Sequence, residues 1–116
     1  MFMSNIVDKG WGYEEIITNT PLYCAKILHV NKGKQMSWHY HNIKDGTFYV
    51  DTGSVWLYWS WTQDINMATV VSLFPGDSFH VPPGMLHRLY GRENARVFEF
   101  STEHFEDDSI RIIKGD

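Results

Sequence analysis

The sequence predicts an all-β protein of the sandwich or jelly-roll type. Short segments rich in β-branched and aromatic residues recur along most of the chain, and glycine, proline and asparagine separate them at regular intervals. Aromatic residues make up 16% of the composition, which suits the half-buried faces of strands. No helical stripe or heptad pattern is sustained. The length of 116 residues fits one domain, so residues 1–116 are expected to form a single unit.

The turn residues set the expected order of elements. Residues 1–20 are expected to form an irregular N-terminal arm with a short apolar stretch at residues 15–18. From residue 23 onward strand and turn alternate, and about eight or nine strands are expected. The tight turn at residues 51–53 predicts a β-hairpin between its flanking strands. The expected strands cover residues 23–30, 35–41, 47–50, 54–61, 67–73, 78–81, 86–90 and 96–101.

Charge and cysteine content exclude some classes of function. The net charge is -4 and the ten lysine and arginine residues are scattered, so the chain has no basic stripe of the kind that binds nucleic acid. The N-terminal segment has neither the basic start nor the apolar run of a signal peptide, and we expect a cytoplasmic protein without a membrane partner. The single cysteine, Cys24, lies in a strand pattern and is expected to be a buried, inert thiol.

The strand at residues 54–61 is apolar on both faces. Such a strand is expected to be covered on both sides. One face would line the interior, and the other would meet either a second copy of the chain, giving a homodimer, or the N-terminal arm. The apolar side chains are Val55, Leu57, Trp59 and Trp61 on one face and Trp56 and Tyr58 on the other.

Three histidines form the clearest candidate site. His39 and His41 are two residues apart on an expected strand, so their side chains leave the same face and can reach one ion. His87 lies on a later strand, shortly after Pro82, Pro83 and Gly84. Three imidazoles brought together across strands suit a divalent transition metal such as Zn, Mn, Fe, Ni or Cu.

The spacing of these histidines resembles both motifs of the cupin family. Gly33, His39-Tyr40-His41 and Gly53 match the first motif, over residues 33–53, and Gly76, Pro82, Gly84 and His87 match the second, over residues 76–91. The resemblance implies a double-stranded β-helix, or jelly-roll, barrel. It also implies a metal inside one mouth of the barrel, held by His39, His41, His87 and normally a glutamate.

This glutamate is missing from the expected place, which is occupied by Asp45 and Gly46. The spacing back from Gly53 selects Gly46 as the aligned position, and the alternation of strand residues points it to the same side as the histidines. Asp45 would point the other way unless a bulge turned it inward. Three alternatives follow: three histidine ligands plus water, recruitment of Asp45, or loss of the metal.

A second resemblance covers more of the chain and suggests a substrate. The segment Trp11-Gly12-Tyr13-Glu14-Glu15 and the ending Phe98-Glu99-Phe100-Ser101-Thr102 before Asp107-Asp108 and Arg111 resemble the cupin domain of type II mannose-6-phosphate isomerases. Those proteins act on phosphorylated sugars, so the resemblance implies a small sugar phosphate as ligand and an aldose–ketose isomerisation as the reaction. Fold alone does not fix an activity.

Several further residues are candidates for the site. Gln35 and Ser37 share parity with the metal histidines and could contact substrate or bond to backbone, and Phe48 is expected on the same face. Glu99 is either a surface residue or a buried proton-transfer base with a raised pKa. His80 is either a partner of a metal ligand or a packed strand residue. Arg88 faces away from His87 by alternation, and the remaining histidines, His29 and His104, are expected to be structural or exposed.

The sequence therefore supports three hypotheses. The first is a metal-binding cupin that binds or isomerises a small phosphorylated sugar, with Glu99 or a bound water moving the proton. The second is a metal-dependent oxygenase or lyase of a small polar acid. The third is a non-catalytic carbohydrate-binding or sensor cupin in which catalysis was lost together with the glutamate.

Overall fold

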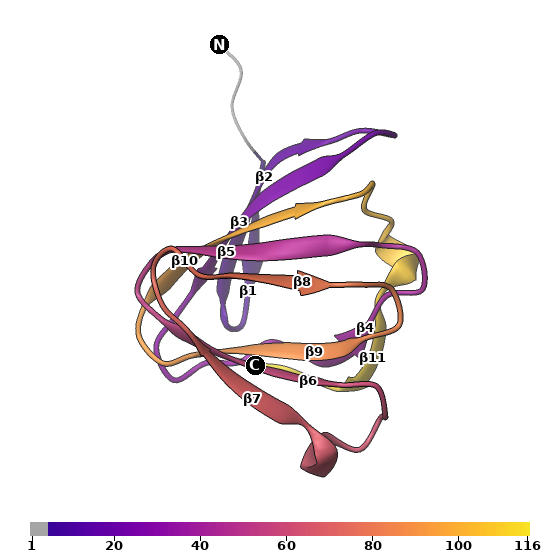
Figure 1. Ribbon diagram of the computed structural model, residues 1–116. Coiled ribbons are helices and arrows are strands. Elements are labelled where there is room, and N and C mark those ends of the chain that lie inside the picture. Colours follow the sequence, from indigo (N-terminus) through magenta and orange to yellow (C-terminus); the bar gives the residue numbers. More distant parts are fainter. Residues whose placement is uncertain (1–4) are drawn as a thin grey trace.

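Two antiparallel β-sheets face each other in the structure, a computed structural model that describes residues 5–116 (Figure 1). The first sheet has the strand order β1-β2-β3-β10-β5-β8 and the second has the order β11-β4-β9-β6-β7. The strands of the first sheet are β1 (Asn5–Lys9), β2 (Gly12–Asn19), β3 (Cys24–Val30), β10 (Ala95–Ser101), β5 (Gly46–Thr52) and β8 (Ser78–Val81). Those of the second are β11 (Ile110–Ile113), β4 (Trp38–Tyr40), β9 (Leu86–Gly91), β6 (Val55–Ser60) and β7 (Thr69–Leu73). Two short 3₁₀ helices, η1 (Ile65–Met67) and η2 (Glu106–Asp108), interrupt the strands.

The hydrophobic core lies between the sheets and is built from alternate strand residues. Val30 and Val97 reach it from the first sheet, and Leu57 and Leu89 reach it from the second; each is at most 1% exposed. Burial of such a side chain stabilises the fold by about 1.5 to 3 kcal/mol. Because the two sheets contribute alternating residues to one core, the predicted all-β jelly-roll fold is confirmed.

The N-terminal segment is not the irregular arm that we expected. Within its described part, residues 5–20, β1 and β2 form a hairpin, and β2 pairs along the whole of β3. Residues 1–4 lie outside the described residues. Backbone pairing to the edge of β3, rather than an alternating apolar pattern, holds this polar segment in a sheet, and such pairing leaves little trace in the sequence.

The expected hairpin around residues 51–53 is also wrong. β5 pairs with β10 and β8 in the first sheet, whereas β6 pairs with β9 and β7 in the second, so the turn passes the chain from one sheet to the other. Gly53 has a φ of 72°, and a Cβ there would lie 2.1 Å from the carbonyl oxygen of Asn94. A tight turn with glycine can connect the two strands of a hairpin or pass the chain to another sheet. The turn sequence alone does not distinguish the two, so a hairpin was wrongly expected here.

The doubly apolar strand β6 turns only part of its apolar residues inward. Val55 and Leu57 are in the core and Trp59 packs against it, but Trp61 lies beyond the strand and is 59% exposed. On the other face Trp56 stacks on Tyr90, with ring centroids 5.4 Å apart. We considered the N-terminal segment as a possible cover for this face of β6. The hairpin β1–β2 belongs to the other sheet and does not cover it.

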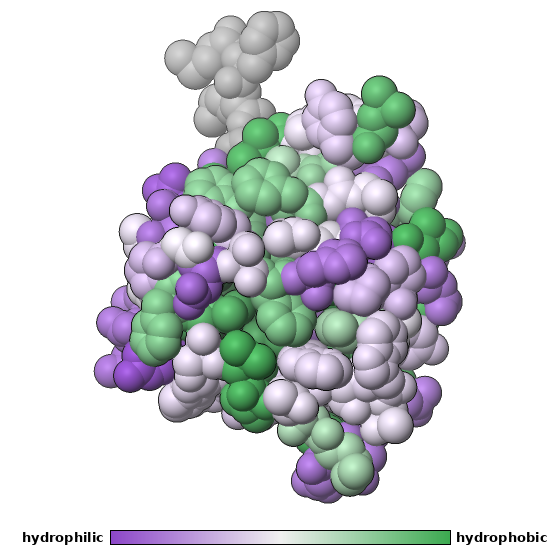
Figure 2. Space-filling view, viewed as in Figure 1, coloured by the Kyte–Doolittle hydropathy of each residue, from purple (hydrophilic) through white to green (hydrophobic). Residues whose placement is uncertain are grey.

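The surface mixes apolar and polar side chains. In the view of Figure 2 a green apolar area crosses the middle of the face and is bordered by purple and white side chains. In residues 5–116 the helices are limited to short 3₁₀ turns, and none is long and apolar enough to span a membrane.

Candidate metal centre

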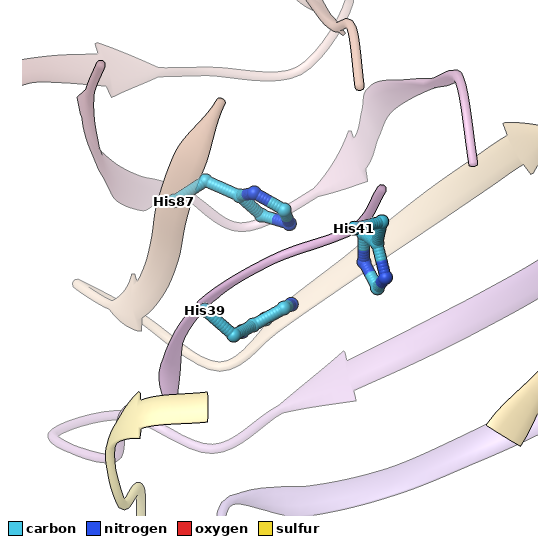
Figure 3. Close-up of side chains that lie close together, drawn as sticks. All are labelled: His39, His41 and His87. Atoms are coloured by element: carbon cyan, nitrogen blue, oxygen red, sulfur yellow. The ribbon is translucent and has the colours of Figure 1, made fainter. Parts of the chain in front are cut away.

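The fold brings His39, His41 and His87 together at one end of the barrel. His39 on β4 stands directly opposite His87 on β9, and His41 follows β4 by one residue. Figure 3 shows the three rings pointing toward a common point. Their ring centroids lie 4.3 to 5.4 Å apart, and one ligand atom from each lies within 4.8 Å of the others. The group could therefore hold a metal ion.

Hydrogen bonds at the other ring nitrogens fix the tautomers. The Nδ1 atoms of His39, His41 and His87 each lie 2.9 Å from a backbone carbonyl oxygen, that of Ser37, Asp108 and Met85 respectively. A carbonyl oxygen only accepts, so each Nδ1 carries the hydrogen and donates it. The three Nε2 atoms then keep their lone pairs, which face one another.

Burial keeps these imidazoles neutral. It lowers the pKa of all three, that of His41 to about 4, and the ring of His87 lowers the pKa of His39 and His41 further. Neutral imidazoles with oriented Nδ1–H groups are the usual form of histidine ligands in metalloproteins. The donor set therefore fits a divalent transition metal such as Zn, Fe, Ni or Mn, with Nε2 of each histidine as ligand atom.

Gly46 is the residue that the spacing selects for the place of the missing glutamate. Gly46 is buried on β5 and shares its face with Phe48. A Cβ there would meet the Cβ of Ser101 at 3.2 Å. Asp45 points away from the histidines, because its Oδ1 accepts a hydrogen bond from His80 at 2.8 Å and its side chain is 47% exposed. Among the described residues no carboxylate oxygen joins the three-histidine group, which leaves an ion with open positions.

Asp108 organises this end of the barrel, a role that the sequence did not reveal. Its buried carboxylate accepts hydrogen bonds from the backbone N–H groups of Asn42, Ile43 and Lys44 at 2.9 to 3.2 Å. Its own carbonyl oxygen accepts from His41. A residue of η2 thus holds both a candidate ligand and the loop that follows it, although the partners are more than 60 positions apart in sequence.

Glu99 faces the histidines from the opposite sheet. It is buried on β10, directly opposite Lys26 on β3 and Phe48 on β5. Its Oε1 lies 3.2 Å from Nζ of Lys44. Burial raises the pKa of the carboxyl, but Lys44 and Lys26, assisted by the histidines, outweigh that effect and lower the pKa to about 2. Our expectation of a raised pKa is therefore wrong, and so is the alternative of a surface residue.

The three candidate substrate contacts lie in different surroundings. Phe48 lines the cavity, and its ring lies 5.9 Å from that of His87. Ser37 also lines the cavity, with its Oγ 2.9 Å from Nδ1 of His39. Gln35 does not line the cavity, because its Oε1 accepts a hydrogen bond from Arg88, 3.2 Å away on the outer face. Strand alternation fails for Gln35 because it precedes the short strand β4.

The other histidines are dispersed. His80 is exposed and paired with Asp45, so it bonds to none of the three clustered imidazoles. His29 stacks on Tyr13 and approaches Glu15 at 3.1 Å. His104, expected to be structural or exposed, lines the cavity with its Nδ1 3.4 Å from Nζ of Lys44. Arg88 points away from His87, as alternation predicted.

The histidines lie in a cavity of about 270 Å³. The turn between β1 and β2 and residues 114–116 border it. Five lysine or arginine side chains line the cavity against four carboxylates, although the chain as a whole is acidic. A divalent ion on neutral histidines would make this cavity clearly positive, so its charge favours a small anionic ligand.

Comparison with solved structures shows the same architecture in three kinds of protein. KdgF from Halomonas sp. is 21% identical and has a TM-score of 0.75, over 89% of this chain and 91% of that chain. CapF of Staphylococcus aureus, a capsular polysaccharide assembling protein, is 15% identical with a TM-score of 0.83 over 97% of this chain. A single-substitution variant of oxalate decarboxylase from Bacillus subtilis is 15% identical with a TM-score of 0.80 over 94% of this chain. The protein has the cupin fold.

The likeness to these cupins concerns the fold. The chain spans about a third of the CapF and oxalate decarboxylase chains, 35% and 30% respectively, and almost the whole of KdgF. No protein-family model and no curated protein sequence matches it. The cupin barrel and its three-histidine group are thus established by geometry, and the reaction has to be argued from the residues of this cavity.

Proposed function

We propose that this protein binds one divalent transition metal through Nε2 of His39, His41 and His87, and that it binds or isomerises a small phosphorylated sugar. The observation that carries the proposal is the set of three Nδ1–H groups tied to carbonyl oxygens, which presents three lone pairs to one point. The lining carries an excess of one positive charge, and a bound divalent ion would add two more, which supports an anionic ligand of small size. The resemblance to type II mannose-6-phosphate isomerases supports a sugar phosphate.

In an isomerisation, the histidines and Glu99 would have different roles. His39, His41 and His87 would hold a divalent ion, which would supply a Lewis acid for polarising a carbonyl group or a pair of hydroxyl groups. Glu99 faces that place and is the candidate group for moving a proton between adjacent carbons. With a pKa of about 2 its carboxylate is a weak base. A ligand anion that binds Lys44 would weaken the attraction between Lys44 and Glu99. The pKa of Glu99 would then rise toward the neutral pH at which a general base works best.

Turnover in the presence of metal tests the proposal. Purified protein with added Mn or Zn should interconvert mannose 6-phosphate and fructose 6-phosphate, and His87→Ala should abolish the reaction. His29→Ala is the matched control, because His29 lies outside the cavity. Glu99→Gln should lower the rate by about 100-fold or more if Glu99 moves the proton. Isomerisation that survives chelation of metal would exclude the proposal.

A binding-only role is the second candidate, and the low pKa of Glu99 favours it. In this case metal-loaded protein would bind mannose 6-phosphate without converting it.

An oxygenase or lyase of a small polar acid is the third. It is favoured by the lack of a carboxylate in the three-histidine group, since an ion with neutral ligands retains its charge for an acid substrate. Oxygen uptake with added iron and a small dicarboxylic acid such as oxalate would support this alternative.

A further inference from the structure

Two lysines are buried in the wall of the cavity that faces the histidines. Lys26 and Lys44 are each 4% exposed. Lys26 lies on β3, directly opposite Glu99 on β10, and Lys44 reaches the same carboxylate from the loop before β5. Burial of an ammonium group is costly unless it is paired, so two of them beside one cavity call for an explanation.

Their present partners leave hydrogen-bond donors unused. Each ammonium has three N–H donors. Lys44 approaches Glu99 at 3.2 Å and His104 at 3.4 Å, which accounts for two of its donors. Within the described part of the chain, Lys26 has an ion pair with Glu14 at 3.7 Å and no partner at hydrogen-bonding distance. Both side chains therefore have donors available to a ligand in the cavity.

The register of the strands places these donors across from the metal group. On the inner face of the first sheet, Lys26, Glu99 and Phe48 are neighbours on β3, β10 and β5. On the inner face of the second sheet, His39 and His87 are neighbours on β4 and β9, and the ring of His87 lies 5.9 Å from that of Phe48. A small molecule between the two sheets would meet the histidine group on one side and the lysines on the other.

We propose that Lys26 and Lys44 form an anion subsite that binds a phosphate or carboxylate group of the ligand while its other end faces the three histidines. This inference rests on the proposed function for the position of the ligand, but the subsite is made by the lysines alone and does not require the metal. Glu99 pairs with Lys44 and Glu14 pairs with Lys26, and neither carboxylate is itself part of the anion contact.

Calorimetric titration of wild-type protein tests the subsite, both metal-loaded and after treatment with a chelator. The probes are inorganic phosphate, mannose 6-phosphate, glucuronate and mannose. The anionic probes should bind, and mannose should bind at least tenfold more weakly than mannose 6-phosphate. Inorganic phosphate should also bind the chelator-treated protein, which separates the subsite from the metal function. Tighter binding of mannose 6-phosphate than of glucuronate identifies phosphate as the preferred group, and the reverse order identifies carboxylate.

Matched variants complete the test. Lys26→Met and the pair Lys44→Met with Glu99→Gln should each weaken phosphate binding by about tenfold or more, because a charged donor is lost. The paired change avoids leaving Glu99 buried without its partner. Lys34→Met removes the same charge from an exposed site outside the cavity and should change nothing. If the paired variant does not fold, Lys26→Met decides the matter. Unchanged phosphate affinity in folded Lys26→Met, or equal affinity for mannose and mannose 6-phosphate, would overturn the proposal.

Discussion

At the scale of single residues, the chemistry of the cavity depends on where three imidazole hydrogens lie. Backbone carbonyl groups of Ser37, Met85 and Asp108 hold them at Nδ1. These acceptors belong to the backbone and survive most side-chain substitutions. The site is therefore arranged for metal before any ion binds, which lowers the reorganisation that binding requires.

The lowered histidine pKa values predict an acid-sensitive metal-free protein. His41 titrates at about 4 in the folded state, below its ordinary value of 6.5. The unfolded chain takes up the proton first, so the contribution to stability is complete above about pH 6.5 and is lost as the pH falls to about 4. The loss from His41 alone is on the order of 3 kcal/mol. The contribution of Glu99 is present above about pH 4.5 and is lost only as the pH falls to about 2.

Urea unfolding of chelator-treated protein between pH 7 and pH 4 measures this effect. His41→Ala should show a shallower pH dependence than wild type, and His29→Ala should not. A free energy of unfolding that stays constant from pH 7 to pH 4 would contradict the account.

Restoring the missing carboxylate should tighten metal binding. Gly46 has no positive φ, so its backbone conformation admits a side chain, but a Cβ would lie 3.2 Å from the Cβ of Ser101 and 3.3 Å from the carbonyl oxygen of Phe100. We expect Gly46→Glu combined with Ser101→Gly to bind Mn or Zn at least tenfold more tightly than Ser101→Gly alone, because a hard anionic ligand is added. Competition with a chelating dye measures the affinity. Equal affinities in the two folded variants would show that the side chain at position 46 does not reach the ion.

The sequence predicted the group of three histidines but missed several residues around it. Spacing was enough for His39, His41 and Gly46, because strand alternation is a local rule. Lys26 shares parity with the buried Leu28 and Val30, so alternation could have placed it inside. Lys44 lies in a loop, where side chains do not alternate, and the contacts of Asp108 join segments that are distant in sequence. The place of neither residue could be predicted from strand alternation.

At the scale of elements, a substitution at Gly53, where the chain passes from one sheet to the other, tests the fold. Gly53→Ala places a Cβ 2.1 Å from the oxygen of Asn94 at a φ of 72°. We expect it to destabilise the protein by at least about 3 kcal/mol, because backbone has to move. Gly33→Ala has a similar φ of 79° and no atom within 4 Å, so it should cost only about 1 to 2 kcal/mol. Thermal unfolding of both variants gives the difference, and equal losses would mean that the contact at Asn94 is not tight.

The predicted strands were most accurate where both flanks carry turn residues. Residues 78–81, 86–90 and 96–101 correspond closely to β8, β9 and β10. The hairpin β1–β2 and strand β11 were missed, because they are held by pairing with β3 and β4 and have little alternating apolar character. The pairing of β5 and β6 was wrong because a turn sequence specifies the bend and not the sheet that follows.

At the scale of the whole molecule, the homodimer stays a prediction. The outer face of β6 and β7 presents Trp56, Tyr58 and Val70, and Val70 is 50% exposed. A second copy would cover this apolar face. Light scattering at micromolar concentration should give twice the mass of the chain, and Val70→Lys should give the mass of one chain. Lys introduced at the exposed Ile6, away from this face, is the control. A wild-type monomer would contradict the prediction.

The metal content of the protein tests the central claim most directly. Elemental analysis of wild-type protein reconstituted with Zn, Mn, Fe or Ni and then desalted should give close to one ion per chain for at least one of these metals. His39→Ala, His41→Ala and His87→Ala should each lose the ion, and His29→Ala and His104→Ala should keep it, because only the first three imidazoles share the common point. Wild-type protein that retains none of the four metals, or a folded His87→Ala that retains as much as wild type, would contradict the account.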